Sequence, residues 1–103
     1  MVTVEERYEH LEKTIRGYNI SADLNQIRAA YEYAREHHGE QMRRDGTPFV
    51  THPINVAQIV AEMRLDSESI IAALLHDCVE DTDCTYEDIA KRFGVTVADI
   101  VDG

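Results

Sequence analysis

The apolar run at 70–75 constrains this chain more than any other segment, because two isoleucines, two alanines and two leucines follow one another there without a polar residue. A helix that is apolar on all sides is buried, so we predict that this run forms the central helix of the core. His76 and Asp77 follow it directly, and two polar side chains at such a place are costly to bury without partners. The fold must therefore supply partners for this pair.

The rest of the sequence also follows helical patterns. A capping box at Thr3 opens a predicted helix that ends near Gly17, and Ser21 or Asp23 begins a second helix that ends at Gly39. Four further helices are predicted at capping residues, which are Thr51, Asp66 or Ser67, Thr85 and Thr96. Since no segment alternates between apolar and polar residues, the sequence predicts an all-α protein of about six helices.

Composition limits the class of protein. A chain of 103 residues with 44% apolar residues predicts one domain over 1–103, with an N-terminal helix at 1–17 and a helical core at 21–103. The formal net charge of −10 argues against a nucleic-acid or membrane-surface partner, because both need a basic face. Cys78 and Cys84 make neither a disulfide framework nor a zinc motif, and no apolar run could span a bilayer. We therefore expect a cytoplasmic protein.

Two histidines and an aspartate form a candidate metal site. His52 lies at the start of the helix that precedes the apolar run, and His76 and Asp77 lie at the end of that run. In a helical hairpin the start of one helix lies beside the end of the next, so these three side chains can meet. Imidazole nitrogen and carboxylate oxygen are good ligands for manganese, iron or zinc.

An acidic pair follows the candidate ligands. Glu80 is four residues after His76, and Asp81 is four residues after Asp77, so each pair shares a face if the helix continues. Glu80 could then act as a general base on an attacking water, or orient it. Asp81 could position a leaving group or hold a ligand histidine. This combination indicates a metal-dependent hydrolase that acts on phosphate esters.

Each feature taken alone has a simpler structural interpretation. His52 before a proline is typical of a helix start, the acidic segment at 80–83 is typical of a solvated turn, and Arg43 and Arg44 are typical of a solvated loop. Cys78 is expected to pack as a small apolar side chain. The five polar residues at 52, 76, 77, 80 and 81 are much harder to explain together in this way.

Two segments of the chain resemble the hydrolase domain of the RelA/SpoT family. The segment 41–53 is similar to the loop and first-ligand motif of that domain, and the segment 72–82 is similar to its His-Asp motif followed by its Glu-Asp motif. The resemblance extends from about Leu24 to the last residue, and it singles out one branch of the HD superfamily of metal-dependent phosphohydrolases.

The resemblance implies an all-helical HD fold that removes pyrophosphate from the 3′ position of guanosine tetra- and pentaphosphate, usually with Mn²⁺, and so ends the stringent response. His52, His76 and Asp77 would be metal ligands, and Glu80 and Asp81 would act on the attacking water and the 3′-pyrophosphate. The two arginines at 43 and 44 would contact the nucleotide through guanine stacking or phosphate charge. Family members that are synthetases with a degenerate metal site are disfavoured, because this chain retains the motifs.

The chain also departs from the family pattern. The family's fourth metal ligand is an aspartate on a helix beyond position 103, and Asp45 stands where many members carry a small hydroxyl residue. We therefore expect a portion of the full domain, with weak or no turnover. One alternative is a catalytically incomplete helical module that associates with itself through exposed helix faces. Another is a different HD nucleotide phosphohydrolase, which the arginine pair and the Glu-Asp pair disfavour.

Overall fold

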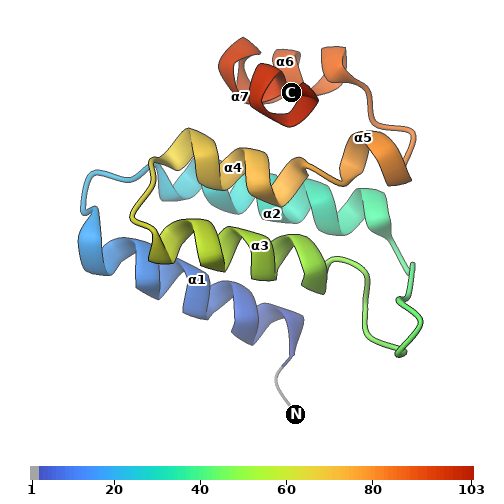
Figure 1. Cartoon of the computed structure of the whole chain (residues 1–103), viewed down its shortest axis with the longest axis horizontal. Coiled ribbons are helices and arrows are strands. Elements are labelled where there is room, and N and C mark those ends of the chain that lie inside the picture. Colours follow the sequence, from blue (N-terminus) through green and yellow to red (C-terminus); the bar gives the residue numbers. More distant parts are fainter. Residues whose placement is uncertain (1–2) are drawn as a thin grey trace.

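The computed structural model of the protein describes residues 3–103, and its regular structure is helical throughout that range (Figure 1). The only bridge between extended segments in the described range joins Met42 to Pro48. The helices are α1 (Val4–Tyr18), α2 (Leu24–His38), α3 (Thr51–Glu62), α4 (Ser67–Leu75), α5 (Cys78–Asp81), α6 (Tyr86–Phe93) and α7 (Val95–Asp102). The all-α prediction is confirmed, and the helix that the sequence did not predict is the short α5.

Several helix starts match the predicted caps. Thr3 and Glu6 form the capping box of α1, and Thr85 forms another with Asp88 at the start of α6. The Asp66 side chain accepts a hydrogen bond from the Ser69 backbone amide at 2.9 Å and so caps α4. These local side-chain bonds satisfy amide groups that have no partner within their own helix.

Three predicted boundaries are wrong. The first helix continues through Gly17 to Tyr18. Thr51 does not cap α3, because Val50 before it already has helical backbone angles and Thr51 is the first helical residue. Thr96 does not cap α7, because that helix begins one residue earlier, directly after Gly94.

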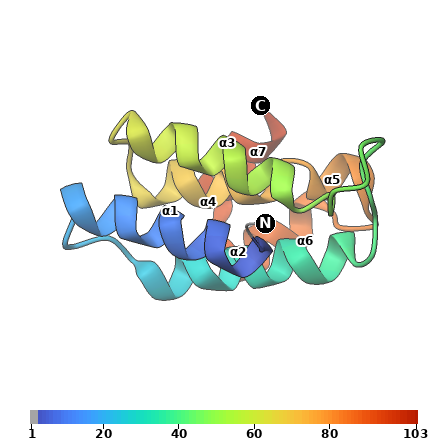
Figure 2. The same ribbon diagram turned by 90° about the horizontal axis from the view of Figure 1, so that it is seen from below.

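The helix α4 lies at the centre of the molecule, as its apolar sequence predicted. All its side chains from Ile70 to Leu75 are buried, and it packs against α2, α3 and α7. Figures 1 and 2 show α1 and α3 side by side, with α4 next to α3 and the α6–α7 pair beyond α4. Buried side chains from α1 to α7 form one cluster around this helix. Within the described range, no helix combines the length and the apolar character that crossing a bilayer requires.

The segment 39–50, which joins α2 to α3, is called the arginine loop below. It lies at the same end of the molecule as α5 (Figures 1 and 2). The Arg43 amide donates to the Thr47 carbonyl at 2.8 Å, and the Gly46 amide donates to the Arg43 carbonyl at 2.9 Å. Gly46 has a φ of +86°, a value that favours glycine, so the loop closes as an ordered turn.

Candidate metal centre

Three different elements bring His52, His76 and Asp77 together. His52 is in the first turn of α3, His76 directly follows α4, and Asp77 directly precedes α5. One ligand atom from each of the three residues lies within 4.8 Å of the other two. The meeting of these side chains, which the hairpin argument predicted, follows from the packing of α3 against α4.

The Asp77 carboxylate lies between the two imidazoles. Its Oδ1 is 3.1 Å from His76 Nε2, and its Oδ2 is 3.5 Å from His52 Nε2. The two rings are 5.9 Å apart between centroids. Asp77 is only 7% exposed, whereas the side chains of His52 and His76 are 38% and 43% exposed. The cluster therefore has a buried carboxylate at its base and two imidazoles that solvent can reach.

One atom of this cluster has no hydrogen-bond partner. Asp77 Oδ2 is buried, and its contact with His52 Nε2 has the distance of an ion pair without the geometry of a hydrogen bond. A buried carboxylate oxygen in this state costs free energy unless a cation compensates it. Ligands on one ion with metal–nitrogen distances of ~2.1 Å lie roughly 3 Å apart, so the observed spacing fits a divalent ion after small side-chain shifts. The donor set of two nitrogens and one carboxylate suits manganese, iron or zinc.

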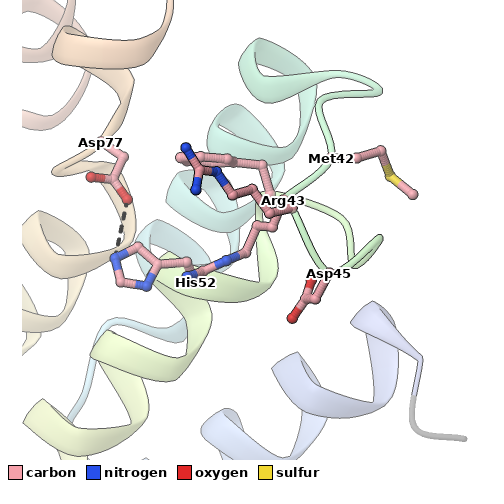
Figure 3. Close-up of a pocket in the computed structure, with 7 residues that line it drawn as sticks. Met42, Arg43, Asp45, His52 and Asp77 are labelled. Atoms are coloured by element: carbon pink, nitrogen blue, oxygen red, sulfur yellow. Dashed lines mark ion pairs between the residues drawn. The ribbon is translucent and has the colours of Figure 1, made fainter.

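The cluster opens into a pocket of about 540 Å³. His52 and Asp77 line one side of it, and residues of the arginine loop line the other, namely Met42, Arg43, Arg44, Asp45 and Phe49. Figure 3 shows His52 and Asp77 pointing toward one another, with the labelled loop residues Met42, Arg43 and Asp45 on the far side of the pocket. The structure therefore places both predicted arginines next to the predicted metal ligands.

Asp45 contributes to the shape of this pocket through the loop. Its Oδ1 accepts hydrogen bonds from the Thr47 backbone amide at 3.0 Å and from the Thr47 hydroxyl at 2.7 Å. These bonds hold the pKa of the Asp45 carboxyl below its usual range, so the group stays ionised while it orders the turn. The acidic residue is thus part of the structure that holds the arginines.

Glu80 and Asp81 lie on the short helix α5, which begins after the end of α4. The helix does not run on from His76, because α4 ends at Leu75 and a turn precedes α5. The Asp81 amide still donates to the Asp77 carbonyl at 2.9 Å, so the predicted four-residue relation holds for that pair. Both acidic residues are exposed, and neither is among the described residues that line the pocket.

Four residues near the site had no role assigned from sequence. Met42 and Phe49 line the pocket, and both belong to the segment that resembles the family loop. His38 is buried at the end of α2 and bonds to Gln41, which in turn contacts α5. No local sequence pattern predicts the contact between Gln41 and Asp81, because these residues are 40 positions apart.

The helical fold and the His-Asp cluster are those of an HD domain. The family model described as "HD domain" matches residues 30–103, and the chain belongs to this family. Within the family, its relatives are of the RelA/SpoT type. The chain is 54% identical over 95 residues to a guanosine-3′,5′-bis(diphosphate) 3′-pyrophosphohydrolase of Aquifex aeolicus (strain VF5), with 92% of this chain and 13% of that protein covered.

Two further comparisons agree with this assignment. The chain is 46% identical over 96 residues to the bifunctional (p)ppGpp synthase/hydrolase SpoT of Escherichia coli (strain K12), with 93% of this chain and 14% of that protein covered. A solved structure described as "A metazoan ortholog of SpoT hydrolyzes ppGpp and plays a role in starvation responses" superposes with a TM-score of 0.70 at 40% identity, covering 75% of this chain and 46% of the other. The chain thus spans only 13% and 14% of the length of these two curated relatives.

Proposed function

We propose that this chain forms the metal-binding part of a cytoplasmic guanosine 3′,5′-bis(diphosphate) 3′-pyrophosphohydrolase and that residues 1–103 belong to its hydrolase domain. The observation that carries the proposal is the meeting of His52, His76 and Asp77 around an unpartnered buried carboxylate oxygen, beside a pocket lined by two arginines. The names of the relatives supply the substrate class. The buried free thiols of Cys78 and Cys84 agree with a reducing compartment.

We propose that the three residues of the cluster hold a divalent ion, with Mn²⁺ as the preferred metal. When bound, such an ion supplies Lewis-acid chemistry, because it polarises a phosphoryl oxygen and makes water more acidic. Both histidines present Nε2 to the cluster and would bind as neutral rings, with Asp77 as the anionic ligand.

The arginine loop would bind the nucleotide. A polyanionic substrate is repelled by a protein with a net charge of −10, so it needs local positive charge at the site. Arg43 and Arg44 provide this charge at the pocket, and their planar guanidinium groups can pair with phosphate oxygens or stack on guanine.

In the proposed reaction a water oxygen attacks the phosphorus bonded to the 3′ oxygen, and the bond to that oxygen breaks. Glu80 would take the proton of the attacking water, and Asp81 would orient the 3′-pyrophosphate. The products are pyrophosphate and guanosine 5′-diphosphate, whose 3′ oxygen receives a proton. Both acidic residues are exposed and do not line the pocket. Whether their side chains reach the substrate therefore depends on the position in which α5 is held.

The test combines metal binding with turnover. We expect Mn²⁺ titration followed by electron paramagnetic resonance to show one site in the wild type and at least about tenfold weaker binding in His52→Ala. In a longer version that includes the family's fourth metal ligand, we expect pyrophosphate release from guanosine tetraphosphate to require Mn²⁺ and to be lost in the same variant. His10→Ala is the matched control, because His10 is an exposed histidine on α1. Equal Mn²⁺ affinity in the wild type and His52→Ala would refute the site.

A second candidate function is self-association, which exposed apolar side chains favour. Ile59 on α3 and Met63 directly after that helix are 58% and 64% exposed, and Val95 and Ile100 on α7 are 60% and 47% exposed. Apolar surface of this kind is typical of protein interfaces. Analytical ultracentrifugation over a range of concentrations tests this candidate, and a monomer at every concentration would exclude it.

A further inference from the structure

A chain of polar contacts runs from one end of α5 to the other through two residues outside it. His38, the last residue of α2, is 2% exposed, and its Nε2 lies 4.0 Å from the Cys78 sulfur. Its Nδ1 lies 3.2 Å from Gln41 Oε1. Gln41 Nε2 then donates to the Asp81 carbonyl oxygen at 3.1 Å. Cys78 is the first residue of α5 and Asp81 is the last.

The directions of the two side-chain bonds of Gln41 follow from the Asp81 carbonyl, which is the final acceptor. The Asp81 carbonyl can only accept, so the Gln41 amide nitrogen faces it and Gln41 Oε1 accepts from His38 Nδ1. The other ring nitrogen of His38, Nε2, faces the Cys78 thiol.

The helix α5 needs such support because it has only 4 residues. A single helical turn is not stable alone, because the backbone entropy lost in forming the first turn exceeds the free energy gained from its hydrogen bonds. Its last carbonyl groups also have no partners within the helix. The His38–Gln41 pair contacts the first residue of α5 and bonds to the last, and α5 carries Glu80.

Gln41 also belongs to the arginine loop, to which it is bonded through its backbone. Its amide donates to the His38 carbonyl at 3.0 Å, and its carbonyl accepts from the Phe49 amide at 2.9 Å. The side chain of Gln41 thus holds α5, while its backbone holds the loop that carries Arg43 and Arg44.

We propose that Gln41, oriented by His38, is a positioning residue that fixes α5, and with it Glu80 and Asp81, relative to the arginine loop. This inference rests on the proposed function for the role of the acidic pair. The positioning itself concerns only the geometry of α5 and can be measured without any turnover.

The first experiment measures the order of α5 by amide hydrogen exchange in Gln41→Ala and Gln41→Glu. The alanine variant removes the side-chain bond to Asp81 and leaves both backbone bonds of residue 41. The glutamate variant keeps the size but places an oxygen against the Asp81 carbonyl oxygen. We expect the amides of Asp81 and Thr82, which bond to carbonyls at 77 and 78, to exchange at least about fivefold faster in both, the factor that one hydrogen bond of typical net strength provides.

The control is Gln26→Ala, which changes a glutamine in the first turn of α2, on the order of 18 Å along that helix from His38. We expect it to leave exchange in α5 at the wild-type rate. Gln41 is exposed, so its variants retain the core, and amides of α4 serve as the internal reference. Unchanged exchange at Asp81 and Thr82 in both Gln41 variants would overturn the inference.

The second experiment measures turnover of guanosine tetraphosphate by a longer version of the protein that includes the family's fourth metal ligand. Since the loop backbone and the metal ligands are untouched, we expect kcat to fall about tenfold in Gln41→Ala while KM and Mn²⁺ affinity change less than about twofold. A loosened α5 with an unchanged kcat would overturn the link between positioning and chemistry. If this longer version hydrolyses nothing, the proposed function fails, and the exchange rates alone then decide whether Gln41 holds α5.

Discussion

Replacing Asp77 with asparagine separates metal binding from the stability of the fold. Asp77 is 7% exposed and its Oδ2 is buried without a hydrogen-bond partner. A buried polar group in this state costs about 1–3 kcal/mol, and more when it is charged. An amide of the same shape carries no charge, so in the absence of metal we expect Asp77→Asn to be as stable as the wild type or more stable by up to ~1 kcal/mol.

In the presence of metal, the wild type should be more stable than Asp77→Asn. An ion that binds only the folded state adds RT ln(1 + [L]/Kd), about 2.7 kcal/mol at a concentration of 100 times Kd. In a domain of about 100 residues, 1 kcal/mol corresponds to roughly 4–8 °C in Tm. We therefore expect Mn²⁺ at that concentration to raise the Tm of the wild type by roughly 10–20 °C and to raise that of Asp77→Asn by less than a third as much.

Differential scanning calorimetry with chelator and with Mn²⁺ measures both effects on the same samples. Asp83→Asn is the matched control, because the Asp83 side chain is 99% exposed and lies 3.8 Å from His37. We expect its Tm and its metal shift to equal those of the wild type. A full Mn²⁺ shift in Asp77→Asn would refute the assignment of Asp77 as a ligand. A fall of more than about 8 °C in chelator would refute the argument that the unpartnered Oδ2 of Asp77 destabilises the metal-free fold.

Three further variants test other parts of the structure. Thr85→Ala removes the capping box of α6 and should lower the free energy of unfolding by about 1 kcal/mol in urea titrations. Arg43→Lys keeps the charge but loses the planar fork, so KM for guanosine tetraphosphate should rise while kcat changes little. Burial raises the pKa of Cys78 from 9.0 to about 12, so the folded state retains a proton that the unfolded state releases; its contribution is complete below pH 9 and is lost as pH rises toward 12. The free energy of unfolding should therefore fall more steeply with pH above 9 in the wild type than in Cys78→Ala, by up to about 1.4 kcal/mol per pH unit.

Local chemistry explains which helix boundaries could be predicted. Thr3, Asp66 and Thr85 cap their helices by accepting hydrogen bonds from amides three residues ahead, and the residue types at these positions predict such bonds. The start of α3 was missed because the Thr51 amide donates to the Pro48 carbonyl at 3.1 Å, so a turn in the loop leads directly into the helix. The start of α7 was missed because Gly94, with a φ of +103°, joins α6 to α7 without a linker.

The candidate site was predictable where it depends on the packing of consecutive helices. His52 meets His76 and Asp77 because α3 and α4 form a hairpin, and apolar periodicity predicts such a hairpin. The Gln41–Asp81 contact depends on the path of a loop and on the turn after α4, and neither has a periodic signal. The acidic pair was predicted on a continuous helix for the same reason, since no residue type marks the break at His76.

The central helix α4 contributes both the core and the site, so the two should respond together to changes within it. Leu74 is fully buried and precedes His76 by two residues, and removing its side chain should cost about 2–5 kcal/mol. The cavity that the substitution leaves allows α4 to shift against α3, and this shift moves His76 relative to His52. We therefore expect Leu74→Ala to weaken Mn²⁺ binding at least about fivefold in the molecules that remain folded. Leu11→Ala is the matched control, because Leu11 is equally buried but lies on α1, which carries no ligand. Mn²⁺ titration at a temperature where both variants are folded distinguishes the two cases. If Leu74→Ala and Leu11→Ala lose the same Mn²⁺ affinity, the geometry of the ligands depends on overall stability, and the argument that α4 sets this geometry is wrong.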